Sequence, residues 1–293
     1  MTDSAIPLPA LLRAVTSRLK GWQTRRAVAS FFRLPYAERV AVTQDTYAHR
    51  QMQASFERYF AGPDRVAAHP QPFYDLILAY AEALRPAAIL QVGCFTALES
   101  RWLAHRGCAA RLIASDFDEE RLAWLGARFA GTQYERIEHR RLDLETATAR
   151  DLDGVGLVVC NAVLSNIQPE GLERFLAAVA ASAVKALIVS DVYTERSLSR
   201  RQQRSEPGDI GRNWFHPYPA LAARHGLGVV FLPDFTASSF VLARGIFVLH
   251  RRIPAALHGD AAAAAMRSYL ARQDEVWADL EAMLPGAARD GTA

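Results

Sequence analysis

The sequence is poor in cysteine, which excludes a disulfide scaffold. Its three cysteines, Cys94, Cys108 and Cys160, form no CxxC pair and cannot all be paired within one chain. A reduced, cytoplasmic setting is the simplest interpretation of this low number.

Long apolar runs and a dominant charge are also missing. No apolar run approaches the ~18 residues of a membrane-spanning helix, so we expect no membrane span. Arg13, Arg18 and Lys20 interrupt the apolar pattern near the N-terminus, which argues against a signal peptide. The net charge is only +3 over 293 residues. This value does not support a nucleic-acid-binding protein, for which a concentrated basic stripe is expected.

Short apolar runs separated by helical patterns fill the middle of the chain. These predicted strands are 88–92, 111–115, 134–142, 155–160 and 185–190. Their alternation with helices indicates β-α-β units and a parallel sheet. Two later runs, 227–232 and 245–251, are joined by a loop alone and predict an antiparallel pair. We therefore predict an α/β fold with a doubly wound, Rossmann-like, seven-stranded sheet, parallel with a terminal antiparallel strand.

Helical patterns flank this sheet on both sides. One predicted N-terminal helix covers about 71–85 and ends before Pro86, and a C-terminal helix covers about 260–284. The predicted regions are an N-terminal helical region (1–85), a Rossmann-like domain (86–254) and a C-terminal helix with its tail (255–293). An apolar stripe from Leu8 to Trp22 suits a membrane surface, but we favour a lid or a homodimer contact.

The stretch AILQVGCFTALESRWLA, residues 88–104, contains the turn from the first strand to the first helix. A dinucleotide loop, G-x-G-x-x-G, requires glycine at the positions of Phe95 and Leu98. Those glycines allow the backbone to approach a pyrophosphate at the helix N-terminus. With Gly93 alone in place, the turn departs from the dinucleotide pattern, and either a different ligand or an ordinary turn explains it.

Four segments in order resemble the motifs of class I S-adenosylmethionine-dependent methyltransferases. They are ILQVGCFTALES, LIASDFDEERL, RRLDLE and GLVVCNAVLSNI. The strand order is also similar to that of the family, over about residues 85–252. The resemblance implies S-adenosylmethionine as the cofactor, bound at the carboxyl ends of the strands. This cofactor has no phosphate, so one glycine can suffice in the first loop.

The resemblance also implies cofactor contacts at successive strand ends. Asp116 would accept hydrogen bonds from the ribose hydroxyls, although Asp116 or Asp118 can alternatively cap the next helix. Asp143 would accept the adenine amino group beside the backbone amide of Leu144, with a solvated loop carboxylate as the alternative. The predicted cofactor-binding residues are Gln91, Gly93, Asp116, Phe117, Asp143, Leu144, Cys160 and Asn161.

Three positions depart from the family pattern. Gln91 replaces an acidic residue and Ala97 replaces a later glycine. A glutamine oxygen can orient a ligand ammonium but carries no charge, which leaves room for an altered pose of the methionine tail. The fourth strand ends in Cys160 and Asn161 instead of the Asp found in metal-dependent O-methyltransferases, so we expect no catalytic metal. Cys160 alone is more simply a core residue.

The polar and aromatic segment 191–220, which follows Asp191 at the predicted end of the fifth strand, is expected to form the acceptor side. His216 is the first candidate for a catalytic base because its unperturbed pKa lies near neutral; a loop histidine bonded to the backbone is the alternative. Tyr193 or Tyr218 is a candidate for a cation–π contact with the sulfonium. Five arginines indicate a solvated face or an anionic substrate group: Arg196, Arg200, Arg201, Arg204 and Arg212.

The function implied is methyl transfer to an oxygen or nitrogen of a small molecule. One alternative is attack at the aminocarboxypropyl carbon, by a second substrate or by ring closure, which releases methylthioadenosine. Gln91 and Ala97 keep this alternative open because the resemblance implies that they would lie beside the methionine tail. A second alternative is a catalytically silent methyltransferase-like protein. The expected partners are a small-molecule substrate and a possible second copy of the chain.

Overall fold

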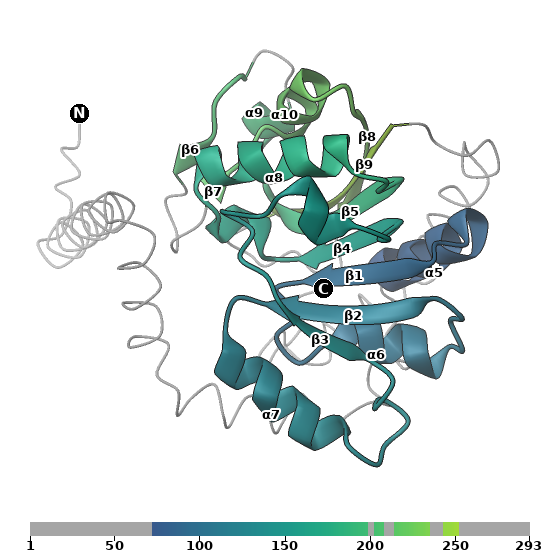
Figure 1. Cartoon of the computed structure of the whole chain (residues 1–293). Coiled ribbons are helices and arrows are strands. Elements are labelled where there is room, and N and C mark those ends of the chain that lie inside the picture. Colours follow the sequence, from purple (N-terminus) through teal and green to yellow (C-terminus); the bar gives the residue numbers. More distant parts are fainter. Residues whose placement is uncertain (1–71, 199–201, 208–213, 235–242, 252–293) are drawn as a thin grey trace, which may run out of the picture.

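The computed structural model describes residues 72–198, 202–207, 214–234 and 243–251 (Figure 1). Its main strands are β1 (Ala88–Val92), β2 (Arg111–Asp116), β3 (Glu138–Arg141), β4 (Leu157–Asn161), β5 (Ala186–Tyr193), β8 (Gly228–Asp234) and β9 (Ala243–His250). They form one seven-stranded sheet in the order β3-β2-β1-β4-β5-β9-β8. Only β9 runs antiparallel to its neighbours β5 and β8, which confirms the predicted sheet.

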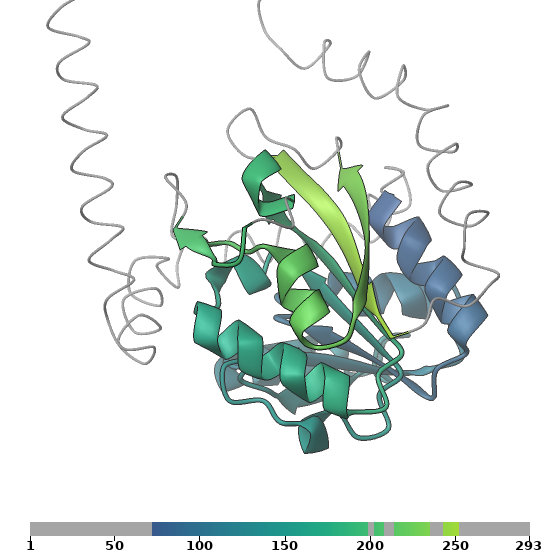
Figure 2. The same cartoon turned by 90° about the horizontal axis from the view of Figure 1, so that it is seen from above.

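Helices cover both faces of this sheet (Figures 1 and 2). One face carries α5 (Pro72–Leu84), α6 (Leu98–His105) and α7 (Glu119–Phe129); the other carries α8 (Pro169–Ala181), α10 (Tyr218–Arg224) and the short helix η1 (Ala149–Leu152). Successive strand side chains point to opposite faces, so Ile89 packs with the first group of helices and Leu90 with the second. The sheet is therefore buried on both sides, as parallel sheets are.

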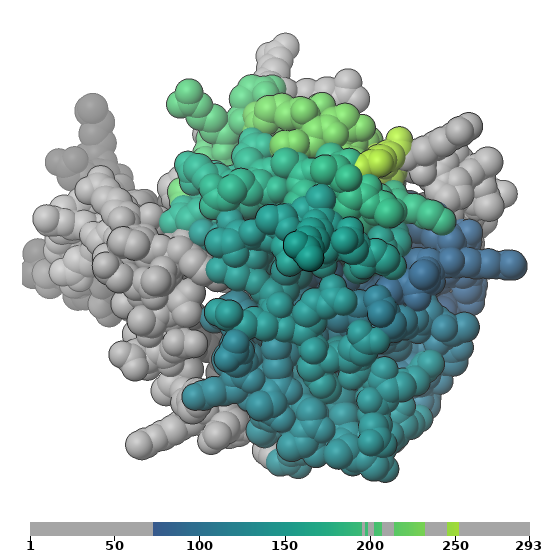
Figure 3. All heavy atoms as spheres, in the orientation of Figure 1, coloured from purple at the N-terminus to yellow at the C-terminus, as the bar shows by residue number. Residues whose placement is uncertain are grey.

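The segment after β5 contains α9 (Glu195–Leu198) and two short strands, β6 (Glu206–Pro207) and β7 (Trp214–Phe215), before α10. The strands β6 and β7 pair with each other, and β7 packs against η2 (Leu164–Asn166), the short helix after β4. In the space-filling view, the green residues of this part of the chain pack directly on the teal residues of α8 (Figure 3). The segment is thus attached to the end of the sheet where β4 ends.

Two predicted strands differ in length from the observed ones. The third was predicted over 134–142, but β3 covers only Glu138–Arg141 because residues 134–137 form a turn. The apolar signal at Tyr134 and Ile137 comes from their packing against α5–α7 and not from a strand. The fifth was predicted to stop at Ser190, yet β5 continues to Tyr193 because β9 pairs with it beyond its last pairing with β4. Asp191 therefore lies inside β5 and not at its end.

The predicted helices at the two ends of the chain, other than α5, lie outside the described residues, and so does the predicted boundary at 254. The division of the chain into three regions stays a prediction. Among the described ranges, no helix combines the length and apolar character that crossing a membrane requires.

Candidate active site

The loop after β1 makes a compact turn at the carboxyl end of the sheet. Gly93, Phe95 and Ala97 all have positive φ angles, of 60°, 51° and 53°. The backbone N–H of Cys94 donates to the Ser115 carbonyl of β2 at 2.8 Å, which holds the loop against the neighbouring strand. Ala97 thus adopts, at the start of α6, the left-handed backbone that glycine adopts most easily. The replacement of the family's glycine does not prevent this turn.

Asp116 lies at the end of β2 and is 2% exposed. Its Oδ1 accepts the backbone N–H of Asp118 at 3.2 Å, and its Oδ2 lies 3.4 Å from the backbone nitrogen of Phe95. The N-cap of α7 is Asp118, whose Oδ1 accepts the backbone N–H of Arg121 at 3.2 Å. Of the two candidate helix caps, the structure therefore uses Asp118, and Asp116 faces the loop after β1.

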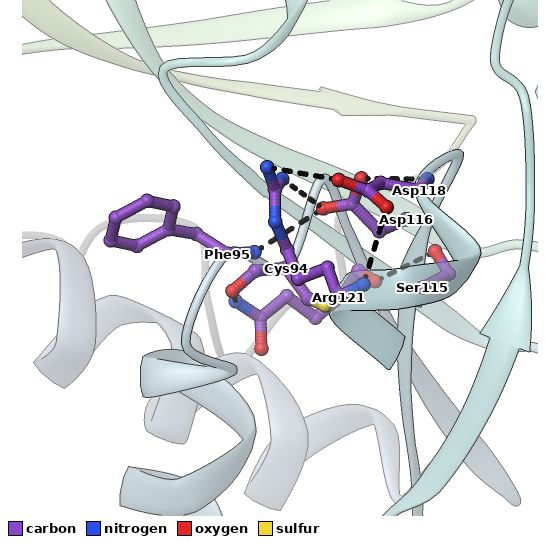
Figure 4. Close-up of polar contacts among 7 residues, drawn as sticks. Cys94, Phe95, Ser115, Asp116, Asp118 and Arg121 are labelled. Carbon is purple, nitrogen blue, oxygen red and sulfur yellow. Dashed lines mark hydrogen bonds and ion pairs between the residues drawn. The ribbon is translucent and has the colours of Figure 1, made fainter. Parts of the chain in front are cut away.

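Arg121 completes this cluster and was not among the predicted site residues. Figure 4 shows its guanidinium beside both carboxylates, with Nη1 3.0 Å from Asp116 Oδ2 and Nη2 3.4 Å from Asp118 Oδ2. Its Cζ also lies 5.8 Å from the ring centre of Phe95. One signal in the sequence could have identified it. Arg121 is a cation in the first turn of a predicted helix, and it lies five residues after Asp116, the carboxylate at the end of the preceding strand.

The predicted adenine-side residues lie beside Asp116. The backbone N–H of Leu142 donates to the Asp116 carbonyl at 2.9 Å, which brings the segment after β3 to the end of β2. Asp143 is half-buried, and its Oδ1 accepts the backbone N–H of Glu145 at 2.9 Å. Leu144 is buried, and Phe117 is half-buried in the bend after Asp116. The structure therefore brings these strand ends together, as the resemblance implied.

Gln91 and Asn161 are joined by a residue that sequence reasoning missed. Glu99, in the first turn of α6, is 3% exposed and accepts hydrogen bonds from Gln91 Nε2 and, at 2.7 Å, from Asn161 Nδ2. The buried stretch of α6 runs from Glu99 to Leu103, so no amphipathic pattern singles out Glu99. The carboxylate missing at position 91 is therefore present in space, supplied by the following helix.

The two cysteines of the site, Cys94 and Cys160, are buried. Burial, followed by the negative charge of Asp116, raises the pKa of Cys94 above its ordinary value. Burial, followed by Asp191, also raises the pKa of Cys160, which is fully buried. Both thiols are therefore neutral, and Cys160 fits the alternative of a core residue at the end of β4.

Asp191 and Tyr218, both in the segment predicted to form the acceptor side, are a buried hydrogen-bonded pair. Asp191 Oδ2 accepts the backbone N–H of Ser165 at 2.8 Å and the hydroxyl of Tyr218 at 2.7 Å. Burial, together with Asp191, raises the pKa of Tyr218 well above its ordinary value. The pair joins β5 and α10 to the segment after β4.

His216 is 1% exposed and is held through both ring nitrogens. Its Nε2 lies 2.9 Å from the Leu164 carbonyl oxygen and its Nδ1 lies 2.7 Å from Ser205 Oγ. Because a carbonyl can only accept, the proton belongs on Nε2, and Nδ1 accepts the serine hydroxyl. Burial lowers the pKa of His216 to about 4. The bond to Leu164 matches the alternative of a backbone-bonded loop histidine. The lowered pKa contradicts the reason for choosing His216 as the base, a pKa near neutral. Nδ1 is the ring nitrogen that can still take a proton.

Tyr193 is half-buried at the end of β5, with its ring 5.0 Å from that of Phe231. Trp214 and Phe215 are also half-buried, and Arg204 is exposed. Arg200, Arg201 and Arg212 lie outside the described residues. In the described ranges, no three His, Cys, Asp or Glu side chains are grouped so as to hold a metal ion.

Comparison with known proteins agrees with this architecture. A family model described as a methyltransferase domain matches residues 89–185. Magnesium protoporphyrin IX methyltransferase from Synechocystis, with bound SAH, is 17% identical, with 72% of this chain and 99% of that chain covered and a TM-score of 0.50. A TehB-like SAM-dependent methyltransferase from Corynebacterium glutamicum is 17% identical, with 68% and 100% covered and a TM-score of 0.46. No curated protein sequence matches the chain.

Proposed function

We propose that this chain, which contains an S-adenosylmethionine-dependent methyltransferase domain, transfers the methyl group of that cofactor to an oxygen or nitrogen of a small molecule. One observation carries this proposal: the hydrogen bond between His216 and the Leu164 carbonyl. It attaches the segment after β5 to the carboxyl end of β4. The described residues around His216 therefore pack beside η2, which follows Asn161 at the end of β4.

The charges at this edge fit S-adenosylmethionine, the cofactor of the family. Glu99 and Asp116 are buried carboxylates and Asp143 is a half-buried one, so the edge favours a ligand that offers hydroxyl donors and a positive charge. We propose Asp116 for the ribose and Asp143 with Leu144 for the adenine. The other proposed contacts are Gln91, Gly93, Phe117, Cys160 and Asn161.

When bound, S-adenosylmethionine supplies an electrophilic methyl group on a sulfonium. The chain must then hold the acceptor in line with that methyl group and receive its proton. We propose that Tyr193 makes the cation–π contact with the sulfonium, since its side chain is half-buried at the end of β5 whereas Tyr218 is fully buried. Asp191 and Tyr218 hold the floor of the site. We propose that Nδ1 of His216 takes the proton from the substrate. To do so, the substrate must replace the hydroxyl of Ser205, which now donates to Nδ1.

We further propose that the acceptor carries an anionic group and that Arg204, whose side chain is exposed, is one of the arginines of the basic segment that would face it. The test is product analysis with S-adenosylmethionine and a panel of small phenols, alcohols and amines, each with and without a carboxylate or phosphate. Methyl transfer releases S-adenosylhomocysteine. Release of methylthioadenosine would instead show attack at the aminocarboxypropyl carbon. A protein that binds the cofactor but releases neither product with any acceptor would contradict the proposal.

A further inference from the structure

A buried carboxylate stands between two of the proposed cofactor residues. Glu99 accepts from the amide nitrogens of Gln91 in β1 and Asn161 in β4, two strands that are neighbours in the sheet. The hydroxyl of Tyr74 in α5 lies 3.4 Å from the same oxygen that Asn161 contacts. Glu99 therefore links two strand ends directly beside the loop that follows β1.

This carboxylate fixes the direction of both amides. An ionised carboxylate can only accept hydrogen bonds, so each amide must turn its nitrogen toward Glu99. Gln91 Oε1 then faces Ser100 and accepts its backbone N–H at 3.0 Å and its hydroxyl at 2.7 Å. Oδ1 of Asn161 lies on the side of its carboxamide away from Glu99, at the half-buried end of β4.

The charge of Glu99 reaches the loop and the strand end. After burial and Asp116, it contributes to the raised pKa of Cys94, in the loop after β1. It also contributes to the raised pKa of Cys160, at the end of β4. These two residues flank the place where the family resemblance puts the methionine tail of the cofactor.

We propose that Glu99 is the positioning residue for the amino-acid tail of S-adenosylmethionine. Its negative charge replaces the acidic side chain that position 91 lacks, and its hydrogen bonds present Asn161 Oδ1 to the ammonium group of the tail. This inference rests on the proposed function, because it requires that the cofactor bind at this edge of the sheet.

A reciprocal exchange offers a matched control. In the double variant Gln91→Glu with Glu99→Gln, the new carboxylate at 91 accepts from Ser100, as Gln91 Oε1 does now. The new amide at 99 donates to that carboxylate and accepts from Asn161. Every hydrogen bond among residues 91, 99, 100 and 161 keeps a donor and an acceptor, and the charge stays within the cluster. The contact of Gln91 Nε2 with the Cys94 carbonyl, at 3.3 Å, is the one that loses its donor. Glu99→Gln alone removes the charge and sets two amide nitrogens against each other.

The experiment is calorimetric binding of two probes to the full chain: S-adenosylhomocysteine, which has the amino-acid tail, and methylthioadenosine, which lacks it. Losing a charge-assisted interaction costs about 10- to 100-fold in affinity. We expect Glu99→Gln to lose about that factor for S-adenosylhomocysteine and to bind methylthioadenosine as the wild type does. The double variant should recover most of the affinity for S-adenosylhomocysteine.

Two results for Glu99→Gln would overturn this inference and leave the proposed function standing. One is an equal loss of affinity for both probes. The other is no loss of affinity for either probe while the wild type binds both. A double variant that is folded by thermal unfolding, yet binds S-adenosylhomocysteine no better than Glu99→Gln, would overturn it too. A wild type that binds neither probe would overturn the proposed function and this inference with it.

Discussion

The side chain of Val163, in the segment after β4, lies directly over the α-carbon of Gly93. A β-carbon placed at Gly93 would lie 2.3 Å from Cγ2 of Val163, far inside van der Waals contact. The backbone of Gly93 also has a φ of +60°, in the left-handed region. Two independent requirements therefore exclude a side chain at this position, and one of them couples the loop after β1 to the loop after β4.

We expect Gly93→Ala to destabilise the protein more than Gly131→Ala does. Gly131 has a similar φ of +69°, but a β-carbon there would meet no atom within 4 Å. Gly131→Ala should therefore cost only the left-handed backbone, about 1–2 kcal/mol. Gly93→Ala should cost about 1–3 kcal/mol more, from overpacking, and Val163→Ala in the same chain should recover part of that excess. Urea unfolding measures all three; equal losses for the two glycine variants would contradict the packing argument.

Substitution of the two carboxylates that contact Arg121 should distinguish a residue that binds the cofactor, Asp116, from one that caps a helix, Asp118. We expect Asp116→Ala to lower the affinity for S-adenosylhomocysteine about 10- to 100-fold, because the ribose would lose a charged acceptor. Asp118→Ala should cost about 1 kcal/mol of unfolding free energy, through loss of the cap of α7, and leave the affinity nearly unchanged. Calorimetry and urea unfolding test both variants. Unchanged binding in Asp116→Ala would remove the ribose assignment.

The strands were predictable where burial alone determines the residues. β1 is buried at every position, and β2 and β4 at all but one end, so each appears as a nearly continuous apolar run. β3 was not predictable, because it is an edge strand whose four residues are all polar, whereas the apolar signal came from Tyr134 and Ile137 in the preceding turn. The end of β5 depends on β9, whose Ala243 pairs with Tyr193 from 50 residues further along the chain.

The site was predictable only where it lies on strand ends. The positions of Asp116 and Asn161 follow from the sheet, whose order the motifs indicated. Glu99 and Arg121 reach the site from helices, and their contacts depend on how α6 and α7 pack against the sheet. Their positions in sequence give no sign of that packing, so the compensation for Gln91 became visible only in three dimensions.

The free energy of unfolding should fall as the pH is lowered below about 6.5, because of His216. Its pKa is lowered to about 4 in the folded protein, against about 6.5 in the unfolded chain. The unfolded chain therefore binds a proton first, so the contribution to stability is constant above about pH 6.5 and falls by about 1.4 kcal/mol per pH unit between 6.5 and 4. Urea unfolding at several pH values should show a shallower fall for His216→Gln, whose amide can still donate to the Leu164 carbonyl. Parallel profiles would show that His216 does not titrate in this way.

Activity should survive removal of divalent metals. The described residues contain no group of His, Cys, Asp or Glu side chains arranged to hold such an ion, and β4 ends in Cys160 and Asn161. We expect turnover, measured with an acceptor found by product analysis, to be the same after incubation with EDTA as without it. Inactivation by EDTA with recovery on adding magnesium would contradict this expectation.

The role of His216 in turnover can be separated from its role in holding the loop. Nδ1 accepts the hydroxyl of Ser205, which is half-buried, so an acceptor can reach this nitrogen only at the position of that hydroxyl. We expect His216→Ala to lower kcat about 100-fold, the lower end of the range for a general base, and to change the affinity for S-adenosylhomocysteine less than two-fold. Ser205→Ala opens Nδ1 and leaves the bond to Leu164 in place, so it should keep most of the turnover. If both variants lose turnover equally, the Ser205–His216 pair holds the segment after β5 and the base lies elsewhere. If cofactor affinity falls in His216→Ala as well, the bond to Leu164 supports the cofactor side of the sheet and the histidine has no separate part in proton transfer.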